Sequence, residues 1–270
     1  MQNLIYGTAW KEAATSDLVS LALRLGFRAI DTANQAKHYS EALVGEALKK
    51  VVGKEISRNK LWLQSKFTSL DGQDHRLPYD AKAGLAEQVR QSCASSLHHL
   101  NTDYLDSYLL HGPYNYPSLG TEDFIVWDAM EELYKKGVVK SIGISNVNYQ
   151  QLKMLIDQAE IKPMIVQNRC YANKGWDKQI RELCKKHSIA YQGFSLLTAN
   201  PDIVSHPEVV NIATKYDVLP AGVIFKFATQ IGINPLTGTT SAEHMSADLN
   251  IIKFDLSNDE VAFIEALGMK

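Results

Sequence analysis

The amino-acid sequence predicts a single (β/α)8 barrel domain over residues 1–270, with extra helices near the C-terminus. The first observation is that short runs rich in β-branched and aromatic residues alternate along the chain with longer segments of helical period. The second is length, because 270 residues are close to the ~250 that are typical of this barrel. The third is that no G-x-G-x-x-G turn follows the first strand, which argues against the alternative of an open, doubly wound dinucleotide-binding sheet.

The predicted strands are short apolar stretches with polar or turn-forming residues at their ends. They cover residues 4–9, 27–32, 61–67, 105–111, 139–145, 164–170, 189–195 and 233–238. Because helical segments separate them throughout, the strands are expected to pair in parallel.

The predicted helices lie between these strands. They cover residues 17–26, 40–52, 81–100, 121–137, 148–159 and 177–188, and a longer helical region covers residues 207–232. Gly26 and Gly137 are typical C-terminal stops. Thr240 with Glu243, and Ser257 with Glu260, have the spacing of a capping box, which predicts helix starts there.

Composition excludes several classes of function. A net charge of -2 and a pI near 6.4 favour neither nucleic acid nor an anionic membrane as a partner. No apolar run reaches the roughly 20 residues of a membrane-spanning helix, and the first residues lack a signal-peptide pattern. Three scattered cysteines do not form a disulfide scaffold, and Cys184 with His187 lacks a second pair for a metal site. We therefore expect a cytoplasmic, metal-free monomer.

Reactive residues fall where successive strands end, which is where barrels of this type place their active sites. A lone lysine at a strand end is more often a surface charge, and a lone histidine is often a satisfied core residue. Their joint occurrence at successive strand ends predicts an active site instead. These residues are Asp31, Lys66, His111, Ser145, Asn146, Gln167, Asn168, Phe194 and Ser195.

Several segments match one known family: YGTAW, GFRAIDTA, EALVGEAL, LWLQSKF, YLLHGP, WDAMEELYKKGVVKSIGISNVNYQQL and VQNRCY. On these segments the chain resembles the aldo-keto reductases over nearly its whole length. It looks like a short member, without the N-terminal hairpin and the long C-terminal loop. The resemblance implies reduction of an aldehyde or ketone to an alcohol by hydride transfer from a nicotinamide cofactor, with a tyrosine as proton donor.

The resemblance also implies a catalytic set of Asp, Tyr, Lys and His, of which Asp31, Lys66 and His111 fill three places. Lys66 is expected to pair with Asp31 and to act on the tyrosine, with a purely structural ion pair as the alternative. His111 is expected to hydrogen-bond the carbonyl oxygen of the substrate.

The position of the tyrosine stays open on spacing alone. The common pattern puts it five residues after Asp31, at Ala36, so this loop looks about two residues longer. The chemistry of proton donation favours Tyr39, with His38 as the alternative. An ammonium about 4 Å away would lower a phenol pKa of ~10 by about three units, towards neutrality, where general acids work best.

The resemblance implies a nicotinamide site as well. Ser145, Asn146 and Gln167 would hydrogen-bond the carboxamide, and Phe194 would stack on the ring unless it is an ordinary barrel-wall aromatic. The other expected cofactor contacts are Gly7, Thr8, Asp31, Ser195, Leu197, Thr237, Gly238, Thr239, Thr240, His244 and Asp248. The expected substrate contacts are Trp10, His111 and Tyr114, with Tyr116 and Trp176 as further aromatic candidates at the rim.

The choice of cofactor departs from the usual family pattern, in which a lysine and an arginine hold the 2′-phosphate of NADPH. Leu236 stands in the place of the lysine, and His244 lies near the place of the arginine. A histidine adds charge only near or below its reference pKa of ~6.5. We expect NADP(H) to be favoured and NAD(H) to be possible, with a preference that is weak and grows as pH falls. The alternative for the turn at residues 237–241 is that it only caps a helix.

A second function from a different class is a catalytically weak barrel that binds the cofactor and serves as a regulatory or structural subunit. The nearly complete catalytic set favours the enzyme. Oxidation of the reduced cofactor by a carbonyl compound would separate the two functions.

Overall fold

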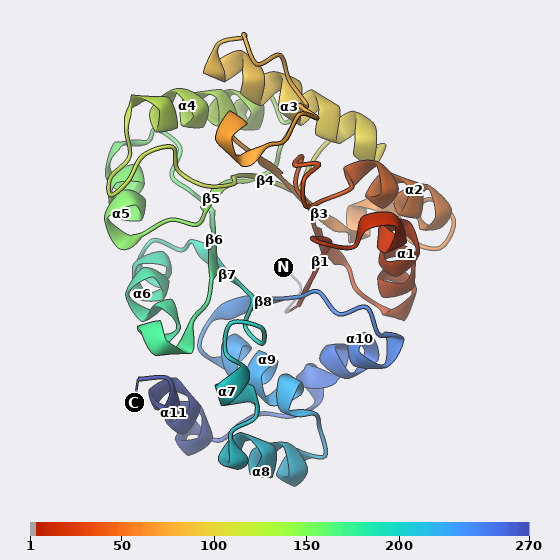
Figure 1. Ribbon diagram of the computed structural model, residues 1–270, viewed down its shortest axis with the longest axis vertical. Coiled ribbons are helices and arrows are strands. Elements are labelled where there is room, and N and C mark those ends of the chain that lie inside the picture. The colour runs from red at the N-terminus through yellow and green to blue at the C-terminus, as the bar shows by residue number, and fades with distance from the viewer. Residues whose placement is uncertain (1–3, 270) are drawn as a thin grey trace.

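Eight parallel strands close into a barrel in the computed structural model, which describes residues 4–269 (Figure 1). The strands follow one another around the barrel in chain order, and β1 pairs with β8 to close it, with Ile5 opposite Leu236. They are β1 (Ile5–Gly7), β2 (Ala29–Asp31), β3 (Trp62–Phe67), β4 (Ser107–Leu110), β5 (Ile142–Ser145), β6 (Ile165–Arg169), β7 (Ala190–Phe194) and β8 (Ile233–Thr237). The predicted barrel is confirmed, and the open sheet is excluded.

Helices join the first seven strands and form the outer ring of the molecule (Figure 1). Each turns an apolar face to the barrel: on α1, Val19, Ala22 and Leu23 are buried. Within residues 4–269, no helix combines the length and apolarity that crossing a membrane requires. These helices are α1 (Thr15–Leu25), α2 (Glu41–Val51), α3 (Leu85–Leu100), α4 (Thr121–Lys135), α5 (Tyr149–Gln158) and α6 (Lys178–Lys186). Short 3-10 segments are η1 (Glu12–Ala14), η2 (Arg58–Lys60), η3 (Leu70–Gly72) and η4 (Ala172–Asp177).

The last third of the chain carries the extra helices that the sequence predicts. Between β7 and β8 lie α7 (Pro201–Val204), α8 (Pro207–Tyr216) and α9 (Pro220–Gln230). After β8 come α10 (Ala242–Leu249), η5 (Asn250–Lys253) and α11 (Asn258–Leu267). The predicted helical region at 207–232 is thus two helices, because Asp217 takes a left-handed conformation that ends α8 and Pro220 then starts α9.

The helix-end signals are largely confirmed. Gly26 ends α1 with a φ of 124°, and the capping box of Ser257 and Glu260 starts α11. The Thr240–Glu243 prediction is wrong by one residue, because Ser241 caps α10 and its hydroxyl accepts a hydrogen bond from the backbone N–H of His244.

Trp176 is a core residue, so its prediction as a rim aromatic is wrong. Its side chain is fully buried, with its ring centroid 5.0 Å from that of Phe227 on α9. The indole N–H donates to the backbone carbonyl of Ile264 on α11 at 3.3 Å. Trp176 therefore joins the C-terminal helix to the barrel wall.

Candidate active site

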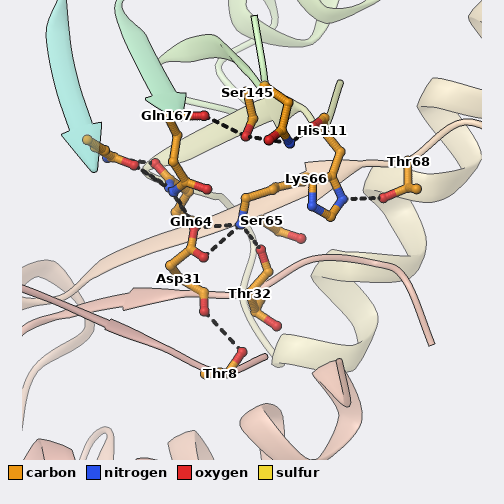
Figure 2. A network of polar contacts seen from close by, with 12 residues as sticks. Thr8, Asp31, Thr32, Gln64, Ser65, Lys66, Thr68, His111, Ser145 and Gln167 are labelled. Carbon is orange, nitrogen blue, oxygen red and sulfur yellow. Dashed lines mark hydrogen bonds and ion pairs between the residues drawn. The ribbon is translucent and has the colours of Figure 1, made fainter. Parts of the chain in front are cut away.

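A buried ion pair stands at the centre of the barrel mouth. The ammonium of Lys66 on β3 lies 2.7 Å from both carboxylate oxygens of Asp31 on β2 (Figure 2). It also donates to the backbone carbonyl of Thr32 at 2.8 Å. Burial lowers the pKa of Lys66 and the Asp31 carboxylate opposes that fall. Three acceptors match the three hydrogens of an ammonium, so the structure unites the two predicted residues as a charged pair.

Three glutamines inside the barrel complete the hydrogen bonds around Asp31. Gln64 and Gln167 donate to Asp31 Oδ1 at 2.7 and 3.0 Å, and both also donate to Gln192 Oε1 at 2.8 Å. Gln64 and Gln192 were not predicted from the sequence. Gln64 could have been found from the two-residue period of a strand. It stands two residues before Lys66 on β3, so the two side chains face the same side of the strand.

Tyr39, rather than His38, faces the ion pair. The ring centroid of Tyr39 lies 5.5 Å from Lys66 Nζ and 5.9 Å from the ring of His111. The ring of His38 packs against Trp10 instead, with centroids 4.0 Å apart, and His38 Nδ1 lies 2.9 Å from Gln35 Oε1. The longer loop thus turns His38 toward Trp10 and brings Tyr39 beside Lys66.

The pKa of Tyr39 differs from our expectation. Burial, and then the Asp31 carboxylate, raise the pKa of Tyr39, so the predicted fall towards neutrality is wrong. The physical reasons are that burial disfavours the phenolate and that the Asp31 carboxylate, 2.7 Å from Lys66, offsets the charge of the lysine. Burial and the neighbouring Lys66 lower the pKa of His111 to about 3. At neutral pH the site therefore presents a protonated phenol and a neutral imidazole.

A cavity of about 730 Å³ opens above these groups, within the range of small-molecule and cofactor sites. It runs from Trp10 and Tyr39 on one side to Thr239 and His244 on the other. The predicted residues that line it are Gly7, Trp10, Asp31, Tyr39, His111, Ser145, Asn146, Gln167, Phe194, Ser195, Leu197, Thr237, Gly238, Thr239, His244 and Asp248.

Seven predicted residues lie outside this lining: Lys66, Thr8, Thr240, Tyr114, Asn168, Tyr116 and Trp176. Lys66 is fully buried beneath it. Thr8 is also fully buried, and its hydroxyl donates to the backbone carbonyl of Asp31 at 3.0 Å, so it joins β1 to β2 and leaves no atom for a cofactor. Thr240 is exposed on the turn after β8, and Tyr114 packs against the hydrophobic core, with its backbone N–H bonded to Asp123 at 2.7 Å.

The middle of the cavity has the polar groups that an amide ligand needs. Ser145 donates its hydroxyl hydrogen to the backbone carbonyl of Gln167 at 2.7 Å. Asn146, which has a positive φ of 55°, donates to the backbone carbonyl of His111 at 2.8 Å. Among residues 4–269 no side chain donates to the amide oxygen of Gln167, which remains free to accept a ligand N–H. With Phe194 lining the same cavity, these groups fit a nicotinamide ring and its carboxamide.

The far end of the cavity holds a lysine that our sequence analysis missed. Lys11 is 9% exposed, lines the cavity, and donates to the backbone carbonyl of Gly238 in the turn after β8. Burial lowers its pKa. Leu236 also lines the cavity, and Thr237 donates to Asp248, whose pKa burial raises to about 6. Lys11 thus places a positive charge beside the turn after β8, which the uncharged Leu236 cannot provide.

Arg169 is a second missed cation at the cavity. It ends β6, two residues after Gln167, and strand period again placed it on the same side of the strand. Its exposed guanidinium lies 5.5 Å from the centre of the Phe194 ring. The cavity therefore carries positive charge at two separate places.

Comparisons with known proteins agree with this arrangement. A family model described as the aldo/keto reductase family matches residues 3–200. The chain is 32% identical to an uncharacterized oxidoreductase, YtbE, of Bacillus subtilis, over 93% of this chain and 82% of that protein. It is 31% identical to aldose reductase B of Dictyostelium discoideum, over 96% and 85%. A solved structure of an aldo/keto reductase from Brucella melitensis superposes with a TM-score of 0.82 at 27% identity, covering 99% of this chain and 95% of the other.

Proposed function

This chain belongs to the aldo/keto reductase family, and from that premise we propose that it reduces an aldehyde or ketone to an alcohol, with Tyr39 as the proton donor and NADPH as the favoured cofactor. The observation that carries the proposal is the grouping of Tyr39, Lys66 and His111 around one cavity. The family accounts for oxidoreductase chemistry on carbonyl compounds, and this grouping supports the assignment of roles.

When bound, the reduced nicotinamide supplies a hydride to the carbonyl carbon. Tyr39 gives its hydroxyl proton to the carbonyl oxygen, so the substrate gains one hydride and one proton and leaves as an alcohol. Because burial and Asp31 raise the pKa of Tyr39, the phenol is protonated at neutral pH and ready to act as an acid. Lys66 lies beside the phenol and stabilises the negative charge that Tyr39 develops as its proton leaves.

Asp31 and the glutamines around it keep Lys66 in position. Without Asp31 the buried ammonium of Lys66 would lose two of its three hydrogen bonds. His111 is neutral, lines the cavity, and offers a ring nitrogen for the carbonyl oxygen. On the open side, Trp10 is 69% exposed and supplies an aromatic wall for a small carbonyl substrate.

The chain's own residues support a nicotinamide cofactor across the length of the cavity. Ser145, Asn146 and Gln167 would hold the carboxamide, and Phe194 would lie against the ring. At the other end Lys11 and the hydroxyl of Thr239 would face the phosphates. Lys11 gives this turn a cation despite Leu236, which supports NADPH as the favoured cofactor while leaving NADH usable.

The test is oxidation of NADPH and NADH, followed by cofactor absorbance, with a panel of aldehydes, α-keto esters and quinones. We expect turnover with aldehydes in the panel and a higher kcat/KM with NADPH. Tight binding of either cofactor, measured by quenching of tryptophan fluorescence, combined with no turnover of any compound would overturn the proposal. That result would instead support a cofactor-binding regulatory barrel.

A further inference from the structure

Thr68 contacts the imidazole of His111 directly. Thr68 follows the last residue of β3, is 4% exposed, and has its Oγ1 2.7 Å from His111 Nδ1 (Figure 2). Neither the site lining nor the ion pair includes Thr68, and its hydroxyl takes no part in the proton transfer described above. The Thr68 hydroxyl can therefore affect the reaction only through its contact with His111.

The segment that follows β3 holds Thr68 in place. Its backbone carbonyl accepts the hydroxyl hydrogen of Tyr79 at 2.9 Å. Its methyl group packs against Gly72, where an added Cβ would stand 2.6 Å from Thr68 Cγ2. A side chain restrained on both sides can define the direction of its hydroxyl.

The backbone of His111 is equally fixed. Its N–H donates to the carbonyl of Phe67 at 2.8 Å, and its own carbonyl accepts from Asn146 at 2.8 Å. Within the described part of the chain, Nδ1 bonds Thr68 and Nε2 has no hydrogen-bond partner. Because the ring lines the cavity, Nε2 is available to a ligand.

A neutral imidazole carries one N–H, and its location decides what Nε2 can do. If Nδ1 held the proton, Nε2 would be an acceptor, and the buried Thr68 hydroxyl would need another acceptor for its own hydrogen. The residues 4–269 provide none for it besides Nδ1. The arrangement that leaves no buried donor unpaired has Thr68 donating to Nδ1, with the ring proton on Nε2.

We propose that Thr68 is a positioning residue that holds His111 in the Nε2–H tautomer and aims that N–H at the carbonyl oxygen of the substrate. The inference rests on the proposed function for the identity of the acceptor. The tautomer itself is a property of the free protein, and it can be measured without cofactor or substrate.

The first test is a spectrum of the free protein labelled with ¹⁵N at its histidines, with long-range proton–nitrogen correlations. Thr68→Val keeps the shape of the side chain and removes the hydroxyl, and Thr68→Ser keeps the hydroxyl. His111→Gln identifies which signals belong to His111. We expect an unprotonated Nδ1 and a protonated Nε2 in the wild type and in Thr68→Ser, and a mixture of tautomers in Thr68→Val. An Nδ1–H ring in the wild type, or the same tautomer in all three proteins, would overturn the proposal.

The second test is kinetic and uses a matched control. Thr68→Val should lower kcat about tenfold with little change in KM, the upper end of what one neutral hydrogen bond contributes, and Thr68→Ser should recover most of the loss. Thr229→Val removes a comparable hydroxyl, which donates to the Lys226 carbonyl at 2.7 Å on α9, and should leave kcat and the His111 spectrum unchanged. An equal loss in Thr68→Ser and Thr68→Val would overturn a role for the hydroxyl.

The two tests separate the two proposals. If no variant and no wild-type preparation turns over any carbonyl compound, the proposed function fails, and the tautomer spectra still decide the role of Thr68. If turnover is present but the spectra show no effect of Thr68→Val, the positioning role alone fails.

Discussion

The two ends of the cavity are built in opposite ways. At the Asp31 end, charges are buried and cancelled: Lys66 and Asp31 are 2.7 Å apart and almost wholly shielded from solvent. Gly238 and Thr240 on the turn after β8, and His244 on α10, are exposed. Lys11 provides a buried cation that contacts a backbone carbonyl and, among residues 4–269, no carboxylate. The first end has its charges paired before any ligand arrives, and the second has charge left over.

The difference follows from where each end is attached. Asp31 stands opposite Gln64 on the paired strands β2 and β3, and Gln167 stands opposite Ser145 on β6 and β5, so the ladder of the barrel sets their distances. Lys11 and His244 stand on loops and on a helix start, where a substitution leaves the barrel intact. Changes at the first end should therefore disable the protein, and changes at the second should adjust its cofactor affinity.

The largest effect is expected for Tyr39→Phe. Loss of the general acid should lower kcat by roughly 10²–10⁴-fold while the Kd for NADPH, measured by fluorescence quenching, stays the same. His38→Phe is the matched control, because His38 packs on Trp10 rather than beside Lys66, and it should retain most activity. Retained turnover in Tyr39→Phe together with its loss in His38→Phe would transfer the role of proton donor to the histidine.

Lys66→Met tests whether the ion pair is needed for stability as well as for chemistry. It leaves the Asp31 carboxylate buried without its cation, and removal of one partner from a buried pair costs about 3–5 kcal/mol. Urea unfolding should show this loss. Lys50→Met, which breaks an exposed pair with Asp17 at 3.4 Å, should change the unfolding free energy by less than about 1 kcal/mol. Similar losses of unfolding free energy in Lys66→Met and Lys50→Met would mean that burial does not make the Asp31–Lys66 pair more important than an exposed pair.

Lys11→Met should weaken cofactor binding without destroying the site. A charge-assisted contact contributes roughly 1.5–3 kcal/mol, so Kd should rise about tenfold to a hundredfold. If Lys11 contacts the phosphates that both cofactors share, the rise should be equal for NADPH and NADH; if it contacts the 2′-phosphate, only NADPH binding should weaken. Lys186→Met, on the exposed surface of α6, is the control and should change neither Kd. Unchanged binding of both cofactors in Lys11→Met would mean that Lys11 serves the turn alone.

The smallest effect is expected for His244→Gln. His244 lies on the exposed start of α10 and lines the cavity, close to the turn after β8. Exposed groups contribute weakly, so the ratio of kcat/KM for NADPH to kcat/KM for NADH should fall about fivefold or less. The measurement is kcat/KM for both reduced cofactors in the wild type and in His244→Gln. An unchanged ratio would contradict a role for His244.

The sequence by itself determined the barrel and most of the residues at the candidate active site. Each predicted strand run contains one of the eight strands, because apolar runs and helical periods are local patterns that the fold preserves. Asp31, Lys66 and His111 were predictable for the same reason: they end or follow strands, and parallel strands in a barrel bring those ends to one mouth.

Only the tertiary structure decided which neighbours the side chains meet. Whether Tyr39 or His38 lies beside Lys66 depended on the course of a lengthened loop, for which spacing carries no register. Lys11 reaches a turn 227 residues away in the chain, and Thr68 meets His111 across 43 residues, distances that no local pattern records. The raised pKa of Tyr39 likewise came from burial and from the charge balance of the Asp31–Lys66 pair, since electrostatic energies depend on the positions of all the charges together.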